Sequence, residues 1–233
     1  MHSGLWHVAL PVFWALATPL FYLAARAVNR RTGAWWSSPL LLSWLFCLVP
    51  ALLLHTSYRE YLVGTHWLLT LLGPTTVAFA LPIYEQRELI RRHWPILAVG
   101  LVVGCSVALG SSWLLATWLS LSPELCRTLL PRSFTTPFAM AASSDVGGRP
   151  DLTAVCVVVT GILGGMVGES LRKLLPLRST LARGMMFGMG AHGVGVAKAR
   201  EVGREEGSVA GLVMVLAGLS CVAVAPLVAL FLH

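Results

Sequence analysis

The chain has 233 residues, of which 56% are hydrophobic and 12% are charged. Soluble domains carry about a quarter charged residues, so this composition excludes an ordinary soluble domain and predicts a membrane protein with several spans. The formal net charge of +7 is assigned to cytoplasmic loops, where Lys and Arg accumulate in membrane proteins, and not to binding of nucleic acid.

The first half of the chain contains four apolar stretches, each long enough for a spanning helix of about 20 residues. They lie at residues 5–27, 39–55, 67–84 and 94–120. The third contains Pro74 and Pro82, and proline removes a helical hydrogen bond, so we expect this stretch to be kinked or interrupted. A basic amphipathic connector, 85–92, leads into the fourth. We expect residues 1–128 to form a scaffold of four spans.

The second half alternates irregular segments with clean apolar ones. Residues 129–148 hold Pro131 and Pro137 and a series of hydroxyl side chains, whereas residues 181–199 hold five glycines and a central His192. Neither composition suits a straight spanning helix. Within one integral domain, residues 129–233 are predicted to form a hairpin at 129–148, a span at 152–171, a second hairpin at 181–199 and a last span at 208–232.

The basic residues favour a topology in which both irregular segments enter the membrane and return on the same side. If each segment crossed, the basic cluster at 172–183 would lie opposite the other three clusters, against the tendency of Lys and Arg to stay cytoplasmic. If both are re-entrant, all four clusters are cytoplasmic and both termini are periplasmic. The alternative, in which both segments cross and the rule is locally violated, stays open.

The re-entrant topology implies an inverted repeat of a hairpin followed by a span. At an offset of 56 residues, several positions agree, among them Asp145 with Glu201 and Gly147 with Gly203. Inverted repeats with interrupted helices that meet near the membrane midplane are typical of secondary transporters. The predicted fold is all-α and polytopic, with about six full spans and two broken or re-entrant segments.

The two irregular segments also predict a solute site, because backbone without helical hydrogen bonds is tolerated in a bilayer only where it lines a cavity or is buried. The N-termini of half-helices attract anions, hydroxyls add donors, and the charge of His192 can change near neutral pH. Arg132 or Lys198 would supply positive potential. The residues predicted to bind a small organic anion are Arg132, Ser133, Thr135, Thr136, Pro137, Ala191, His192, Gly193, Gly195 and Lys198.

Simpler interpretations of the same residues stay open. His192 could serve helix packing, Thr135 and Thr136 could satisfy a proline kink, and Lys198 could extend from a helix end to the membrane surface. The five cysteines are scattered without metal-ligand spacing. The sequence contains no G-x-S-x-G or H-E-x-x-H motif, so we expect no enzyme, no metal site and no cofactor.

Several segments closely resemble the LrgB/CidB family. They are residues 73–84, 130–141 and 160–164, the tripeptide 182–184, residues 190–199 around His192, and the step 206–208 before the last span. The resemblance extends over nearly the whole chain in the same order. It implies a multi-pass protein of the bacterial inner membrane.

The resemblance implies two functions. One is transport of small monocarboxylates such as glycolate, glycerate or pyruvate, and the other is an antiholin-like regulation of murein hydrolase export and cell lysis with a holin-like LrgA/CidA partner. We expect the first, as a secondary transporter or facilitator with proton coupling through His192 as a hypothesis. The second is the alternative, and a homodimer is the expected assembly.

Overall fold

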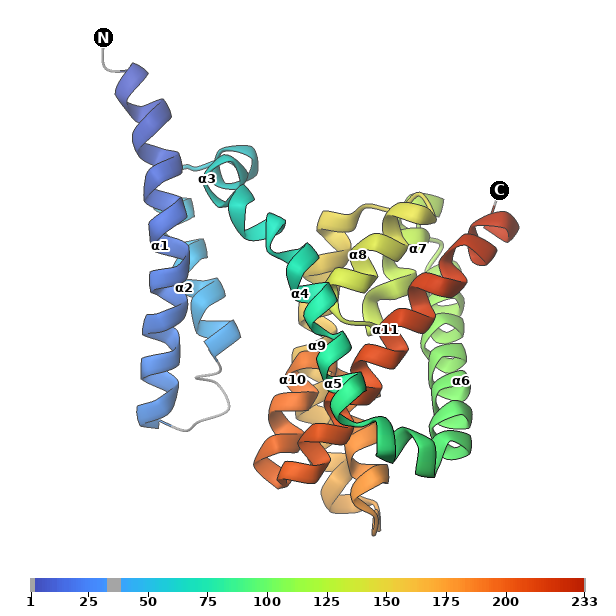
Figure 1. Cartoon of the computed structure of the whole chain (residues 1–233). Helices are drawn as coiled ribbons and strands as arrows, with labels where there is room; N and C mark the ends of the chain where they lie inside the picture. The colour runs from blue at the N-terminus through green and yellow to red at the C-terminus, as the bar shows by residue number, and fades with distance from the viewer. Residues whose placement is uncertain (1–2, 33–38, 233) are drawn as a thin grey trace. The chain divides into compact units, whose positions relative to one another are not determined.

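The computed structural model describes residues 3–32 and 39–232, and in these ranges every regular element is a helix (Figure 1). The predicted all-α fold is confirmed. The chain divides into two compact units, residues 1–75 and 76–233, which are described one at a time. The division after residue 128 stays a prediction.

The first unit contains α1 (Ser3–Thr32), α2 (Pro39–Leu53) and α3 (Tyr58–Thr70), with α1 packed against both of the others. Trp14 is fully buried, and its ring centroid lies 5.1 Å from that of Tyr61. Gly64 lies on the backbone of Pro11, where an added Cβ would come within 2.9 Å of the proline Cα. A small residue therefore lets α3 approach α1 closely.

The predicted interrupted span is divided into short helices. After α3 the chain forms α4 (Leu72–Ala78) and α5 (Ala80–Glu85), and then α6 (Arg87–Trp118). Within α6, His93 has non-helical angles (φ −120°, ψ 18°) and precedes Pro95, which removes a helical hydrogen bond. The break separates Arg87–Arg92, the part of the basic connector that lies in α6, from the apolar span that follows.

The first irregular segment is a helical hairpin, named here the first hairpin (Pro123–Asp145). It contains α7 (Pro123–Leu129), the 3₁₀ turn η2 (Leu130–Ser133) and α8 (Thr136–Asp145). Two extended residues, Phe134 and Thr135, form its tip. The chain returns to its starting end, because the N–H of Arg149 donates to Oγ1 of Thr128 over 3.0 Å. The hairpin begins six positions before the predicted start at 129.

Hydroxyl groups anchor the base of the first hairpin to α9 (Pro150–Leu174). The side chains of Thr128, Ser143 and Thr153 are fully buried. The Thr153 Oγ1 lies 2.7 Å from the Ser143 Oγ and 2.9 Å from the Thr128 carbonyl oxygen. Each buried hydroxyl thus has a partner, as a stable apolar interior requires.

The second irregular segment, α10 (Thr180–Val202), also folds back on itself. At its centre His192 has φ 39° and ψ −121°. Phe187 and Ala199 share one buried cluster, although a straight helix would separate positions twelve residues apart by about 18 Å. A Cβ added to Gly195 would collide with the carbonyl oxygen of Phe187. The arms Thr180–Ala191 and Gly193–Val202 therefore form a second hairpin with His192 at its tip.

The two hairpins approach α9 from opposite ends. The first is anchored beside Thr153 near the start of α9, and its tip reaches Thr160. In the second, Phe187 lies on Gly168, Gly190 on Gly164, and His192 on Gly161. That arm therefore runs from the C-terminal end of α9 to its middle, and the hairpins meet there.

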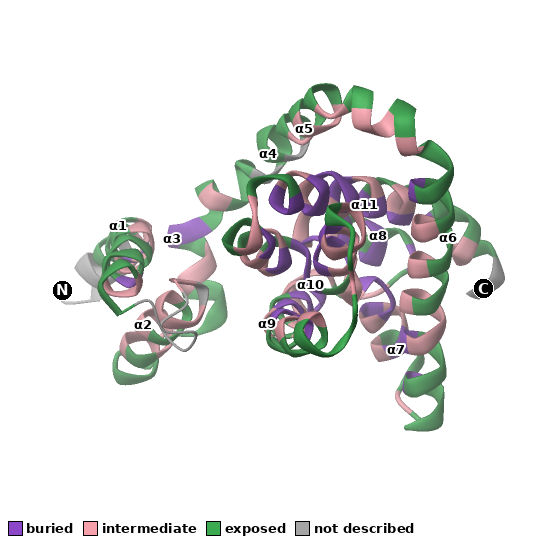
Figure 2. Ribbon diagram, turned by 90° about the horizontal axis from the view of Figure 1, so that it is seen from below, coloured by how far each residue is buried: buried purple, intermediate pink, exposed green. Residues whose placement is uncertain are grey.

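The last helix, α11 (Arg204–Leu232), completes the core. Its N-terminal half packs against the second hairpin, where Gly188 lies on Ala210. Its C-terminal half packs against α8, where Phe138 covers Gly218. The buried residues gather in α8, α9, α10 and α11 (Figure 2), so this group of helices forms the interior that holds both hairpin tips.

Five helical stretches in the described ranges are long and apolar enough to cross a membrane. They are Ala9–Thr32, Tyr58–Glu85, Arg87–Trp118, Pro150–Leu174 and Arg204–Leu230. A shorter apolar helix covers Leu41–Leu53. The chain is a multi-pass membrane protein, as predicted, while the count of six full spans stays a prediction.

Candidate functional site

The two hairpin tips meet at adjacent residues in the middle of α9. Nη1 of Arg132, on η2, donates to Oγ1 of Thr160 over 3.4 Å. The imidazole of His192 covers Gly161, because a Cβ added there would lie 3.1 Å from the ring Nδ1. The turn η2 also lies directly against α10. The structure therefore brings Arg132 and His192 to one turn of a spanning helix.

His192 combines burial, backbone strain and an unused hydrogen-bonding atom. Its side chain is 4% exposed, and Nε2 is buried without a hydrogen-bond partner in the part of the chain that the structure describes. A positive φ at a non-glycine residue costs about 1–3 kcal/mol and is retained mainly where function requires it. An unpartnered buried polar atom is also unfavourable. The hairpin tip therefore holds a buried ring nitrogen whose hydrogen-bonding capacity is unused among the described residues.

Two helix N-termini add backbone donors. In the first turn of α8 and of the second arm of α10, N–H groups have no partner inside their helix, and such ends carry a partial positive charge. Thr135 is the N-cap residue of α8, but its side chain makes no capping hydrogen bond. A Cβ on Gly193 would meet nothing within 4 Å, so space exists beside this backbone for an approaching group.

The predicted site residues fall into two groups around this point. Arg132, Ser133, Thr135, Thr136 and Pro137 lie on η2, at the tip and at the start of α8. On α10, His192 and Gly193 lie at the break. Ala191 contributes packing instead, because its Cβ lies against Gly164. Gly195 likewise lets the arms approach each other.

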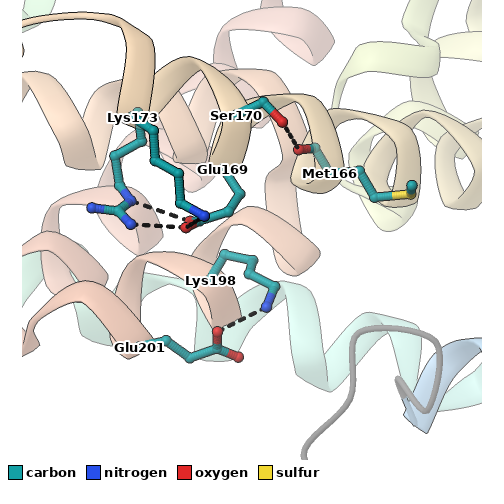
Figure 3. A network of polar contacts seen from close by, with 7 residues as sticks. Met166, Glu169, Ser170, Lys173, Lys198 and Glu201 are labelled. Atoms are coloured by element: carbon teal, nitrogen blue, oxygen red, sulfur yellow. Dashed lines mark hydrogen bonds and ion pairs between the residues drawn. The ribbon is translucent and has the colours of Figure 1, made fainter.

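Lys198 is placed in an ion pair rather than at the hairpin tips. Its Nζ lies 2.8 Å from Oε2 of Glu201, one turn along the same arm. Figure 3 shows the ammonium group directed toward Glu201. A separate cluster of ion pairs lies near the C-terminal end of α9. There, Oε1 of Glu169 lies 2.8 Å from Nη2 of Arg172 and 3.5 Å from Nζ of Lys173. Of the two cations considered for the site, Arg132 is the one that bonds to Thr160 in the middle of α9.

Sequence reasoning missed Thr160 and Gly161 as site residues. The glycines at 161, 164, 165 and 168 form a stripe of small residues, which normally indicates helix packing. They do serve packing, but Gly161 also seats His192, and Thr160 accepts from Arg132. Among residues 3–32 and 39–232, no group of three or more His, Cys, Asp or Glu side chains is arranged to hold a metal ion.

Opposed helical hairpins that place a cation and a buried histidine beside one span define a class of protein: a multi-pass membrane protein with a site built from discontinuous helices. Within that class the chain belongs to the LrgB-like family, whose model matches residues 18–231. The resemblance found in the sequence is thereby confirmed.

Two relatives from Bacillus subtilis (strain 168) are similar over nearly their whole length. The "Uncharacterized protein YwbG" is 35% identical over 215 residues, which cover 92% of this chain and 96% of the relative. The "Uncharacterized protein YxaC" is 31% identical over 218 residues, which cover 94% of this chain and 95% of the relative. No solved structure matches.

Proposed function

We propose that the chain transports small organic monocarboxylates, such as glycolate, glycerate or pyruvate, through the site where the hairpin tips meet. The observation that carries the proposal is the convergence of Arg132 and the unpartnered Nε2 of His192 on the central turn of α9. Intramembrane ionisable groups are rare and usually mark a pathway for ions or solutes.

The chemistry of the site suits one carboxylate. The Arg132 guanidinium offers a fixed fork of N–H donors, which matches the two oxygens of a carboxylate group. Further hydrogen-bond donors to the carboxylate come from the backbone at the N-terminus of α8 and from the first N–H groups after His192. The hydroxyls of Thr135 and Thr136 can donate as well. Gly193 leaves space beside the backbone at the second tip for a small solute. A single arginine favours a monoanion over a dianion, which needs a second countercharge.

The opposed hairpins supply a route for alternating access. In the proposed topology each hairpin enters the membrane from one side, returns, and separates the site from that side. Displacing one hairpin would open the site to one compartment while the other keeps it closed, as in other transporters with inverted repeats. The proposed location is the bacterial inner membrane, with both termini periplasmic.

Uptake into proteoliposomes tests the function. The purified protein should accumulate labelled glycolate, pyruvate or lactate, and the variant His192→Gln should keep only a small residual uptake while keeping its helical circular dichroism and its elution volume. His66→Gln is the matched control, since His66 is exposed on α3. Absence of uptake by the unaltered protein, with and without a holin-like partner, would overturn the proposal.

Proton coupling through His192 is part of the proposal. The variant His192→Gln should abolish any pH dependence of residual uptake, because glutamine keeps hydrogen-bonding atoms but does not titrate. Retention of the pH dependence in this variant would exclude His192 as the coupling group.

The alternative is an antiholin-like regulator that acts with a holin-like partner. Cysteine labelling separates the two, because the transporter topology requires residues 134–145 to be reachable from the periplasm and 188–198 from the cytoplasm. Reactivity of both segments from one side only, or of neither, would favour the regulator. A homodimer and a holin-like partner stay predictions, which crosslinking in membranes would test.

A further inference from the structure

The junction between α5 and α6 forms a corner outside the site described above. The backbone leaves helical geometry at Gln86 (φ −97°, ψ 14°) and again at His93 (φ −120°, ψ 18°). The six residues between them, Arg87–Arg92, form a short helical connector whose direction differs from that of the span after it (Figure 1). Two bends so close together create a concave surface between α5 and the connector.

The connector has one face on the protein core and one face exposed. Leu89 and Ile90 pack against a buried cluster that includes Leu97 of α6 and Leu212 of α11. The four charged side chains of the connector, Arg87, Glu88, Arg91 and Arg92, are exposed. This division is typical of a helix that lies at a membrane surface.

A hollow lies on the inner side of the corner. The hollow is open to its surroundings and, with the adjoining open space, measures about 590 Å³; its lining is formed by Ala80, Ile83, Tyr84, Arg87 and Ile90. Four of these five side chains are aliphatic or aromatic. Arg87 is the one charged group in the lining, so the hollow has an apolar wall and a cationic rim.

The position of the Arg87 guanidinium is fixed by Tyr84. Its Cζ lies 4.5 Å from the centroid of the tyrosine ring, and its Nη1 donates to the Tyr84 carbonyl oxygen over 3.0 Å. A guanidinium carries five N–H donors, and this carbonyl takes one of them. The remaining donors are held at the rim, and Arg91, one turn further, lies on the same helix face.

The surroundings place this rim at the edge of the apolar spans. Tyr84 is 65% exposed and Trp94 is 64% exposed, and such aromatic residues concentrate at the level of lipid headgroups. The helix that ends at Glu85 and the span that follows His93 are both apolar. A cation at this level can reach a headgroup while the apolar wall below it faces acyl chains.

We propose that this hollow is a binding site for an anionic phospholipid. The phosphate would bind Arg87 with support from Arg91, and one acyl chain would lie against Ile83 and Ile90. Glu85 and Glu88 oppose three arginines in this stretch, so the segment is not a broad basic patch. Recognition depends instead on one oriented arginine above an apolar hollow, a combination that an amphiphile satisfies and a water-soluble anion does not.

Native mass spectrometry of the detergent-purified full chain tests the site, with phosphatidylglycerol and phosphatidylcholine as probes. The protein should bind phosphatidylglycerol more tightly, and Arg87→Gln should weaken this binding about fivefold, the contribution expected of one arginine near a membrane surface. Arg92→Gln is the matched control, because it removes the same charge from the same connector but not from the hollow. It should change the affinity less than twofold.

Three results would overturn the lipid site. They are equal affinity for the two lipids, an equal loss in Arg92→Gln and Arg87→Gln, and displacement of phosphatidylglycerol by free glycerol phosphate at the same concentration. The last would identify a simple phosphate site. Each measurement is independent of transport, so failure of the lipid site leaves the proposed transport function untouched.

Discussion

The imidazole of His192 lies on the bare Cα of Gly161, in the middle of α9. One residue earlier on the same turn, Thr160 accepts a hydrogen bond from Arg132 of the first hairpin. A single turn of one span therefore fixes groups from both hairpins. A displacement of either hairpin would therefore change the distance between the histidine and the arginine, and the proposed transport mechanism requires such a link between solute binding and opening.

At position 192, glycine should be more stabilising than alanine, the reverse of the order in an ordinary helix. In an ordinary helix alanine is favoured over glycine by about 1 kcal/mol, but the φ of 39° at this position favours glycine. We expect His192→Gly to unfold at a higher temperature than His192→Ala, by a difference equivalent to about 1 kcal/mol. Both variants lack the imidazole and should lose uptake.

Thermal unfolding in detergent, followed by circular dichroism, measures this difference. Ala182→Gly, within the first arm of α10, provides the control when compared with the unaltered protein, and it should show the ordinary order, with alanine more stable. A more stable alanine at both positions would mean that residue 192 is in regular helix.

A substitution at Thr160 should lower uptake with little change in stability. Thr160→Val keeps the shape of the side chain but removes the acceptor of Arg132. Because a hydrogen bond to a charged group contributes about 1.5–3 kcal/mol, and this one is long, we expect uptake to fall about tenfold at subsaturating solute. Thr160→Ser should retain most uptake.

The readout is initial uptake over a range of solute concentrations, with the melting temperature measured in parallel. Thr117→Val is the control, since that hydroxyl bonds only to carbonyls of its own helix, α6, among the described residues. Equal loss of uptake in the valine and serine variants would assign the effect to packing rather than to the hydroxyl.

Gly164 of α9 and Gly110 of α6 predict opposite effects of the same substitution to alanine. A Cβ on Gly164 would collide with the backbone carbonyl oxygen of Gly190, which cannot rotate away. We expect Gly164→Ala to destabilise the protein by about 1–3 kcal/mol and to lower uptake, because the arm that carries His192 must move.

Gly110→Ala is the matched control, since nothing lies within 4 Å of a Cβ at that position in α6. In an open helical site, alanine should be neutral or stabilising by up to about 1 kcal/mol. Similar melting temperatures for the two variants would contradict the close approach of α10 to α9.

Much of this architecture could be predicted from local composition. Pro137 after two threonines, and the glycines around His192, disfavour straight helices at both tips, and the structure breaks the helices at Thr135 and at His192. The basic clusters supported hairpins because charge placement reflects topology. Helix-breaking residues act locally, and the charge of a loop is a sum over its residues. Both can therefore be read from a single sequence.

One site contact that the sequence does not show depends on packing between distant segments. Thr160 became a candidate only when η2 placed Arg132 beside it, twenty-eight positions along the chain. Lys198 and Glu201 are three positions apart on one helical arm, a spacing that allows an ion pair, and the structure forms that pair. The start of the first hairpin at Pro123 was missed because α7 has seven residues, too few for a periodic apolar pattern.

The base of the second hairpin predicts one further effect, at Glu206 on α11. Its side chain is 7% exposed, and its carboxylate accepts a hydrogen bond from Nη1 of Arg183 over 3.2 Å. The same guanidinium donates to the carbonyls of Leu177 and Arg178. The Arg183 guanidinium therefore connects the first arm of α10 to α11 through the ion pair and to the preceding loop through two hydrogen bonds. Glu206→Gln leaves a partly buried arginine without its countercharge.

We expect Glu206→Gln to lower the unfolding free energy by about 1–3 kcal/mol, less than for a fully buried pair, because Arg183 is 29% exposed. Glu201→Gln, which breaks the exposed pair with Lys198, should cost less than about 0.5 kcal/mol. In a double-mutant cycle, the double variant Arg183→Gln/Glu206→Gln should lose less unfolding free energy than the sum of the losses in the two single variants. Additive effects would show that the two side chains stabilise the hairpin base separately, and the link between α10 and α11 would then lie elsewhere.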